Sequence, residues 1–171
     1  MNDLIPLYKE MAADGQNFRG LSLLQHSKQI GQIIRSHNTR TILDFGCGRG
    51  DPYRGPYKVW REWGVKWFDI WLYDPAFKEH EKLPPEGKKF DLVICSDVLE
   101  HIPGADVDEF VKGLFARART YVWASVCCRP AKKTFPTTGE NLHVTLHPMQ
   151  WWYDTFTEHA GGVPFTLVET P

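Results

Sequence analysis

Three glycines at alternate positions follow directly after a short apolar segment. Residues 41–45 read TILDF, and Gly46, Gly48 and Gly50 come next. Glycine adopts positive φ and lets a ligand approach the backbone closely, so this pattern predicts a buried strand that ends in a ligand-binding turn. In an open α/β sheet, ligands bind beyond the carboxyl ends of the strands. The turn therefore predicts a nucleotide-type site.

Two acids accompany this turn. Asp44 lies two residues before the first glycine and extends the pattern to D-x-G-x-G-x-G. This pattern differs from the G-x-G-x-x-G fingerprint of dinucleotide-binding proteins and from the phosphate-binding G-x-x-x-x-G-K-[ST] loop. Asp74 follows the apolar stretch 66–73. A carboxylate at such a place accepts hydrogen bonds from two neighbouring ribose hydroxyls. The alternative for Asp74, which precedes Pro75, is that it only opens a turn.

A third motif, FDLVICSDVLEHI, occupies residues 90–102. Together, the three motifs resemble the class I S-adenosylmethionine (SAM) methyltransferases, and the resemblance covers residues 21–126 and, more loosely, the end of the chain. It implies a Rossmann-like, doubly wound, mostly parallel sheet. It also implies SAM as the methyl donor, S-adenosylhomocysteine as its product, and methyl transfer to a nucleophile.

The resemblance also implies which side chains contact the donor. The residues expected at the methionine part of SAM lie in and before the glycine turn and are Asp44, Gly46, Cys47 and Gly48. The acid expected to hold the ribose is Asp74, and the residues expected to face the sulfonium follow the FDLVIC strand and are Ser96, Asp97 and Val98. The residues expected to reach the carboxylate of SAM lie in the helix before the first strand and are Gln25, His26 and Lys28.

Three histidines are candidate general bases for transfer to an oxygen, namely His101, His143 and His147. Histidine titrates near neutral pH, and methyl transfer to a hydroxyl often needs the proton removed. His143 and His147 alternate with Thr145, so an extended segment places all three on one face, beside Trp151 and Trp152 as an aromatic wall. The alternative for each histidine is a structural hydrogen bond.

Metal binding is not predicted, because the H-x-x-x-H pair has no acid or thiol in register with it. The cysteines at 47, 95, 127 and 128 fit neither a disulfide framework nor a C-x-x-C zinc pattern. A reducing cytoplasm is the expected setting. The N-terminus lacks the pattern of a signal peptide, and no apolar run approaches the length of a membrane span.

These side chains need an α/β scaffold. Helical spacing covers 21–36, 57–63, 106–119 and 149–159, and strand-like stretches cover 41–45, 66–73, 90–95, 120–126 and 164–169. This order predicts a doubly wound sheet. Residues 74–91 contain no strong strand, and no sequence follows for a seventh strand, so we expect a reduced third strand and a missing seventh one.

We expect a single methyltransferase domain over 1–171, with a helical N-terminal segment (1–40), a SAM-binding core (41–126) and an acceptor-side segment (127–171). The net charge of −1 argues against a nucleic-acid partner, as does SDVL at 96–99, where base N-methyltransferases carry [DN]-P-P-[YF]. The predicted reaction is methyl transfer to a small-molecule or sugar-like acceptor at oxygen. The alternatives are a non-catalytic protein of the same fold, such as a pseudo-enzyme or assembly partner, or a nucleic-acid or protein methyltransferase.

Overall fold

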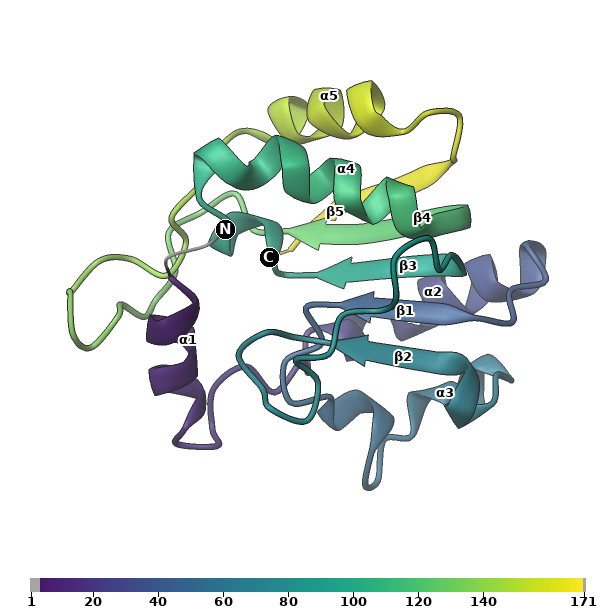
Figure 1. The fold of residues 1–171 in the computed structure, drawn as a ribbon, viewed down its shortest axis with the longest axis horizontal. Coiled ribbons are helices and arrows are strands. Elements are labelled where there is room, and N and C mark those ends of the chain that lie inside the picture. The colour runs from purple at the N-terminus through teal and green to yellow at the C-terminus, as the bar shows by residue number, and fades with distance from the viewer. Residues whose placement is uncertain (1–3, 171) are drawn as a thin grey trace.

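The computed structural model describes residues 4–170. Its centre is a five-stranded sheet with the order β2-β1-β3-β4-β5, in which all neighbouring strands are parallel. Because neighbouring strands are parallel, their carboxyl ends meet at one edge of the sheet, toward which the visible arrowheads in Figure 1 point. The strands are β1 (Ile42–Phe45), β2 (Ile70–Tyr73), β3 (Phe90–Ser96), β4 (Ala118–Val126) and β5 (Phe165–Glu169).

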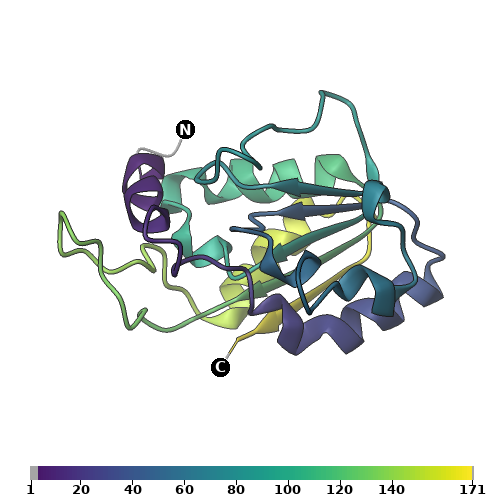
Figure 2. The same cartoon turned by 90° about the horizontal axis from the view of Figure 1, so that it is seen from below.

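Helices cover both faces of the sheet (Figure 2). On one face, α2 (Leu23–Ser36) and α3 (Val59–Trp63) pack on a cluster that includes Ile42 and Leu92. On the other face, α4 (Val107–Arg117) and α5 (Met149–His159) pack on a cluster that includes Leu43 and Val93. Successive strand residues point to opposite faces, which is why the neighbouring pairs 42/43 and 92/93 divide between the two cores.

The spacing of apolar residues explains why α2 forms and where it docks. Leu23, Ile30 and Ile34 are buried on one stripe, while Lys28 and Gln29 are exposed. Full burial of such aliphatic side chains contributes about 1.5–3 kcal/mol each. The helix therefore lies firmly against the sheet, with its first turn near the end of β1.

The predicted α/β class with a Rossmann-like parallel sheet is confirmed. Within residues 4–170 no strand lies between β2 and β3, and the five strands of the sheet are all parallel. The second strand was predicted to begin at residue 66, and this is wrong. β2 pairs only with β1, and this pairing begins at Ile70. The three residues before it, Trp67–Asp69, form a short 3-10 helix, η2.

Two segments far apart in sequence lie beyond the carboxyl ends of the strands (Figures 1 and 2). One is α1 (Ile5–Ala12), and the other is the long connection 129–147 between β4 and α5. They pack together through a small core of Met11, Phe135 and Leu142. The sheet edge that the sequence predicted as the ligand side is therefore covered. In the described part of the chain, no helix combines the length and apolar character needed to cross a membrane.

Candidate functional site

A cavity of about 1430 Å³ lies at the carboxyl ends of the strands. Its walls come from the glycine turn, the residues after β2 and β3, α1, α4 and the 129–147 segment. Single-ligand pockets usually measure about 300–1,000 Å³. The volume is therefore large enough for two ligands side by side. Its aromatic lining consists of Tyr8, Phe18, Phe45, Tyr73, Phe77 and Phe110.

The glycine turn at the end of β1 requires glycine for steric reasons. Gly46 has φ of +95° and Gly48 has φ of +57°. A Cβ atom on Gly46 would lie 2.3 Å from Val98 Cγ2, and one on Gly48 would lie 2.0 Å from the carbonyl oxygen of Phe18. The backbone of the turn is thus pressed between the residue after β3 and the segment before α2, and its remaining side lines the cavity.

Asp74 supports this turn directly. Its carboxylate accepts hydrogen bonds from the backbone N–H of Gly48 at 2.8 Å and from that of Ala76 at 2.9 Å. Burial raises the pKa of Asp74, although both backbone N–H groups act in the opposite direction. Asp74 also lines the cavity. The acid at the end of β2 therefore fixes the glycine turn and presents a carboxylate beside it.

The residues at the carboxyl end of β3 line the cavity. They are Ser96, which ends the strand, and Asp97 and Val98, which follow it. That they face the reacting group stays a prediction. Asp97 has φ of +53°, an uncommon conformation for a residue other than glycine. Ser125 in β4 donates a hydrogen bond to Asp97 Oδ1 at 2.9 Å and accepts one from the Asp97 N–H at 3.1 Å. This pair of bonds holds the strained residue in place, a common arrangement at functional sites.

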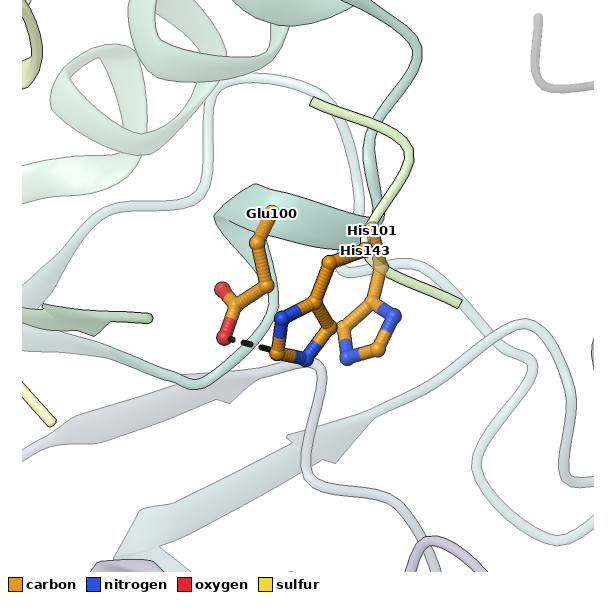
Figure 3. Close-up of side chains that lie close together, drawn as sticks. All are labelled: Glu100, His101 and His143. Atoms are coloured by element: carbon orange, nitrogen blue, oxygen red, sulfur yellow. Dashed lines mark ion pairs between the residues drawn. The ribbon is translucent and has the colours of Figure 1, made fainter. Parts of the chain in front are cut away.

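Three further side chains meet at one end of the cavity (Figure 3). Glu100 and His101 belong to the short 3-10 helix η3 (Leu99–His101), and His143 comes from the 129–147 segment. The distance from His143 Nε2 to Glu100 Oε1 is 4.0 Å, and the two imidazole ring centres are 5.0 Å apart. We refer to these three residues as the Glu-His-His cluster.

Hydrogen bonds fix the orientation of both rings in the cluster. His101 Nδ1 lies 2.9 Å from the carbonyl oxygen of Leu142, and His143 Nδ1 lies 2.5 Å from that of Arg129. A carbonyl oxygen only accepts, so each Nδ1–H donates and Nε2 is the ring nitrogen left for another partner. Burial, and secondly the neighbouring His143, lowers the pKa of His101 to about 4. Burial, and secondly the charge of Asp97, raises the pKa of Glu100 to about 8.

A comparison with protein families agrees with this geometry. A family model described as a methyltransferase domain matches residues 15–166, which is most of the chain. The chain belongs to this methyltransferase family. No curated protein and no solved structure matches it significantly. Membership confirms the predicted reaction class, a SAM-dependent methyl transfer, and the predicted cofactor SAM.

The cavity of this methyltransferase fits SAM. Gly46 and Gly48 both line the cavity, so a cofactor bound there would lie against backbone that carries no side chain. The turn offers backbone groups for the methionine part, and the Asp74 carboxylate beside it suits two ribose hydroxyls. Gln25 in the first turns of α2 also lines the cavity. These residues are the ones that would hold the cofactor.

Other residues predicted to contact SAM lie off the cavity wall. Lys28 is exposed on α2, and the His26 ring packs on Trp123, with ring centres 4.9 Å apart. Cys47 is buried under the turn, and burial raises the pKa of its thiol. Asp44 is only 3% exposed and lies behind the turn. For these four residues a direct contact with SAM stays a prediction.

Asp44 instead has a supporting position. Its Oδ2 accepts a hydrogen bond from the Tyr53 hydroxyl at 2.8 Å, while its buried Oδ1 has no partner. Burial raises the pKa of Asp44 to about 7, with a smaller contribution from Asp74 and an opposing one from Tyr53. An acid with this pKa is partly neutral at the pH of most experiments.

This shifted pKa predicts a pH dependence of stability. Between about pH 4 and pH 7 the folded protein binds the Asp44 proton more tightly than the unfolded chain does, so the free energy of unfolding falls as the pH rises through this window. The contribution of Asp44 has a slope of up to about 1.4 kcal/mol per pH unit. Asp44→Asn removes it. In urea denaturation at pH 5, 6, 7 and 8 without SAM, the free energy of unfolding should fall less steeply with pH for Asp44→Asn than for the wild type. Equal slopes of the free energy against pH would contradict the prediction.

His147 and the tryptophans after it do not lie where the sequence placed them. His147 stacks on Trp151 with ring centres 3.9 Å apart, and neither residue lines the cavity. Trp152, which belongs to α5, is fully buried in the core. The predicted aromatic wall is therefore wrong, because Trp152 fills the core and Trp151 stacks on His147 outside the cavity. Thr145 is also buried, and its hydroxyl donates to the carbonyl oxygen of Ile102.

Two residues of the site were not predicted from the sequence. Glu100 was not among the predicted site residues, yet it is 0% exposed and its Oε2 has no hydrogen-bond partner. Tyr8 lies in α1, and its hydroxyl contacts the Leu142 carbonyl at 3.1 Å and His101 Nδ1 at 3.2 Å. For Glu100 the sequence did contain a signal, namely an acidic residue next to a histidine shortly after a buried strand. Nothing local indicated Tyr8.

Proposed function

We propose that this methyltransferase transfers the methyl group of SAM to an oxygen of a small-molecule or sugar-like acceptor. The observation that carries the proposal is one cavity with the glycine turn at one part and the Glu-His-His cluster at another. When bound, SAM supplies a methyl group on a positively charged sulfonium. The cluster offers a group that removes a proton from the acceptor.

Two features support a hydroxyl acceptor. An alcohol becomes a good nucleophile only as its proton leaves, so the site needs a base near the reacting oxygen. Both histidines of the cluster have a free Nε2. His101 is a weak base because of its lowered pKa of about 4. His143 is therefore the base that we propose, and His147 has no access to the cavity lining.

Two other features support a small acceptor. The cavity exceeds the usual volume of a single-ligand pocket, so space remains beside a bound SAM. α1 and the 129–147 segment lie over this space and join through their own apolar core, which restricts the access of large polymers. The net charge of −1 gives no general attraction to nucleic acid. The four cysteines carry free thiols, and the cytoplasm is the compartment that we propose.

The first experiment is a calorimetric titration of the protein with SAM and with S-adenosylhomocysteine. We expect one site for each. Incubation with isotopically labelled SAM and a panel of hydroxylated metabolites and sugars should then give a product heavier by one methyl group, and its fragmentation identifies the methylated atom. Product formation only with nucleic acid or protein, or at nitrogen, would overturn the proposed acceptor.

Asp74 gives a direct test of the donor site. Asp74→Ala removes a carboxylate that holds the Gly48 N–H and that we assign to the ribose. Hydrogen bonds to charged groups contribute about 1.5–3 kcal/mol, so we expect the Kd for SAM to rise about 10- to 100-fold. Asp154→Ala removes an exposed carboxylate on α5, outside the cavity, and is the matched control. An unchanged Kd for Asp74→Ala would contradict the assignment.

A further inference from the structure

We propose that Glu100, His101 and His143 bind a divalent transition-metal cation such as Co²⁺ or Zn²⁺ at the cavity wall. One ligand atom from each residue lies within 4.8 Å of the other two. The sequence did not predict this site, because it paired His143 with His147. The fold instead brings His143, from the segment after β4, against the two residues of η3 (Figure 3).

The hydrogen bonds of both histidines suit a metal ligand. A ligating histidine usually donates its other ring N–H to a carboxylate or a backbone carbonyl, which fixes the tautomer and aims the free nitrogen. His101 and His143 both do this through Nδ1, to the carbonyl oxygens of Leu142 and Arg129. Two residues from different parts of the chain thus present Nε2 as the ring nitrogen that is available to a ligand.

The buried carboxylate gives an independent indication of a missing partner. Glu100 is 0% exposed. Its Oε1 accepts a hydrogen bond from the Cys127 N–H at 3.1 Å, whereas the buried Oε2 has no hydrogen-bond partner. A buried polar atom without a partner costs about 1–3 kcal/mol. Oε1 is the oxygen that lies 4.0 Å from His143 Nε2, so a cation shared with the histidines would reach Oε2 through bidentate binding of the carboxylate.

The ligand set indicates which cations fit. Two imidazole nitrogens and one carboxylate oxygen suit borderline transition-metal ions, whereas Mg²⁺ prefers sites made entirely of oxygen. Ligand atoms at about 2.0–2.2 Å from a zinc ion lie about 3–3.5 Å from one another. Side-chain rotations that move the three ligand atoms about 1 Å closer together would therefore give zinc-binding distances. Three protein ligands leave at least one coordination position open, as in catalytic metal sites.

The binding of a cation by these three residues does not depend on the proposed function. Only the role of the cation in methyl transfer to a hydroxyl rests on it. All three residues line the cavity, so the open position faces the space for the acceptor. An acceptor hydroxyl bound there is oriented, and the divalent charge favours loss of its O–H proton to a water molecule in the cavity. With a cation bound, His143 serves as a ligand, and the cation takes over the activation of the hydroxyl that the proposed function assigns to His143 Nε2.

Cation binding is measured on the untagged full-length protein after treatment with EDTA and dialysis. We expect calorimetry with Co²⁺ or Zn²⁺ to show one site, cobalt to give visible absorption bands of a bound ion, and Mg²⁺ to bind at least about 10-fold more weakly. Glu100→Gln keeps an oxygen for the Cys127 N–H but is a poor cation ligand. This variant and His143→Ala should each lose at least about 10-fold in cobalt affinity.

Two controls separate this proposal from the proposed function. His37→Ala removes an exposed imidazole at the end of α2, far from the cluster in sequence and outside the cavity lining, and should leave cobalt affinity unchanged. SAM affinity, measured on each variant, reports whether the protein is folded. No binding of cobalt or zinc, or binding that Glu100→Gln and His143→Ala leave intact, would overturn the site even if methyl transfer continues. Cobalt binding at the cluster without transfer to any hydroxyl would instead overturn the proposed acceptor and support the site.

Discussion

Replacing His143 by alanine is expected to lower kcat about 10²- to 10⁴-fold while leaving the Kd for SAM unchanged. His143 contacts Glu100 and His101 at the end of the cavity that we assign to the acceptor. The groups that we assign to SAM lie at the glycine turn and at Asp74, and His143 has no hydrogen bond to either. Loss of the imidazole therefore removes proton transfer, or a cation ligand, without disturbing the donor.

His147→Ala is the matched comparison, since it removes an imidazole four residues later in the same segment. His147 stacks on Trp151 outside the cavity, so its loss should change kcat by less than about twofold once the protein is folded. Equal losses in the two variants, or full activity of His143→Ala, would contradict the assignment. Activity of the wild type after EDTA treatment distinguishes the two roles of His143, because a histidine base works without a cation and a cation ligand does not.

Part of the predicted donor half lines one cavity because its sequence signals are local. The glycine turn, Asp74 and residues 96–98 each lie at the carboxyl end of a strand, and the carboxyl ends of parallel strands necessarily share one edge. Recognising the strands by their apolar runs was sufficient to bring these residues together. The structure adds the steric reason for the turn, a contact between Gly48 and the backbone of Phe18 that no local pattern contains.

The acceptor half could not be predicted in the same way because it depends on contacts between distant segments. Tyr8 and His101 are 93 residues apart in the chain, and Tyr8 and Leu142 are 134 apart. The alternation of His143, Thr145 and His147 suggested one shared face, but Thr145 is anchored to Ile102 and His147 turns toward Trp151. Side-chain packing, rather than strand geometry, decides where these residues point.

Residue 48 provides the strongest test of the donor site. Gly48→Ala is expected to abolish measurable SAM binding and to lower the free energy of unfolding by about 2–4 kcal/mol. The residue has φ of +57°, and a Cβ atom would lie 2.0 Å from a backbone oxygen of the segment that leads into α2. Because the obstacle is backbone, the clash is relieved only if the turn or that segment moves. Either movement displaces the Gly48 N–H from Asp74.

Gly87→Ala separates the effect of the clash from the effect of backbone conformation. Gly87 has φ of +75°, and no atom lies within 4 Å of a Cβ built on it. Its substitution therefore costs only the conformational strain, about 1–2 kcal/mol, and should leave SAM affinity unchanged. Denaturant unfolding and calorimetry on both variants give the comparison. If Gly48→Ala binds SAM as tightly as Gly87→Ala does, the glycine turn is not the surface that holds the cofactor, because a turn forced out of place by a backbone clash cannot keep its ligand contacts.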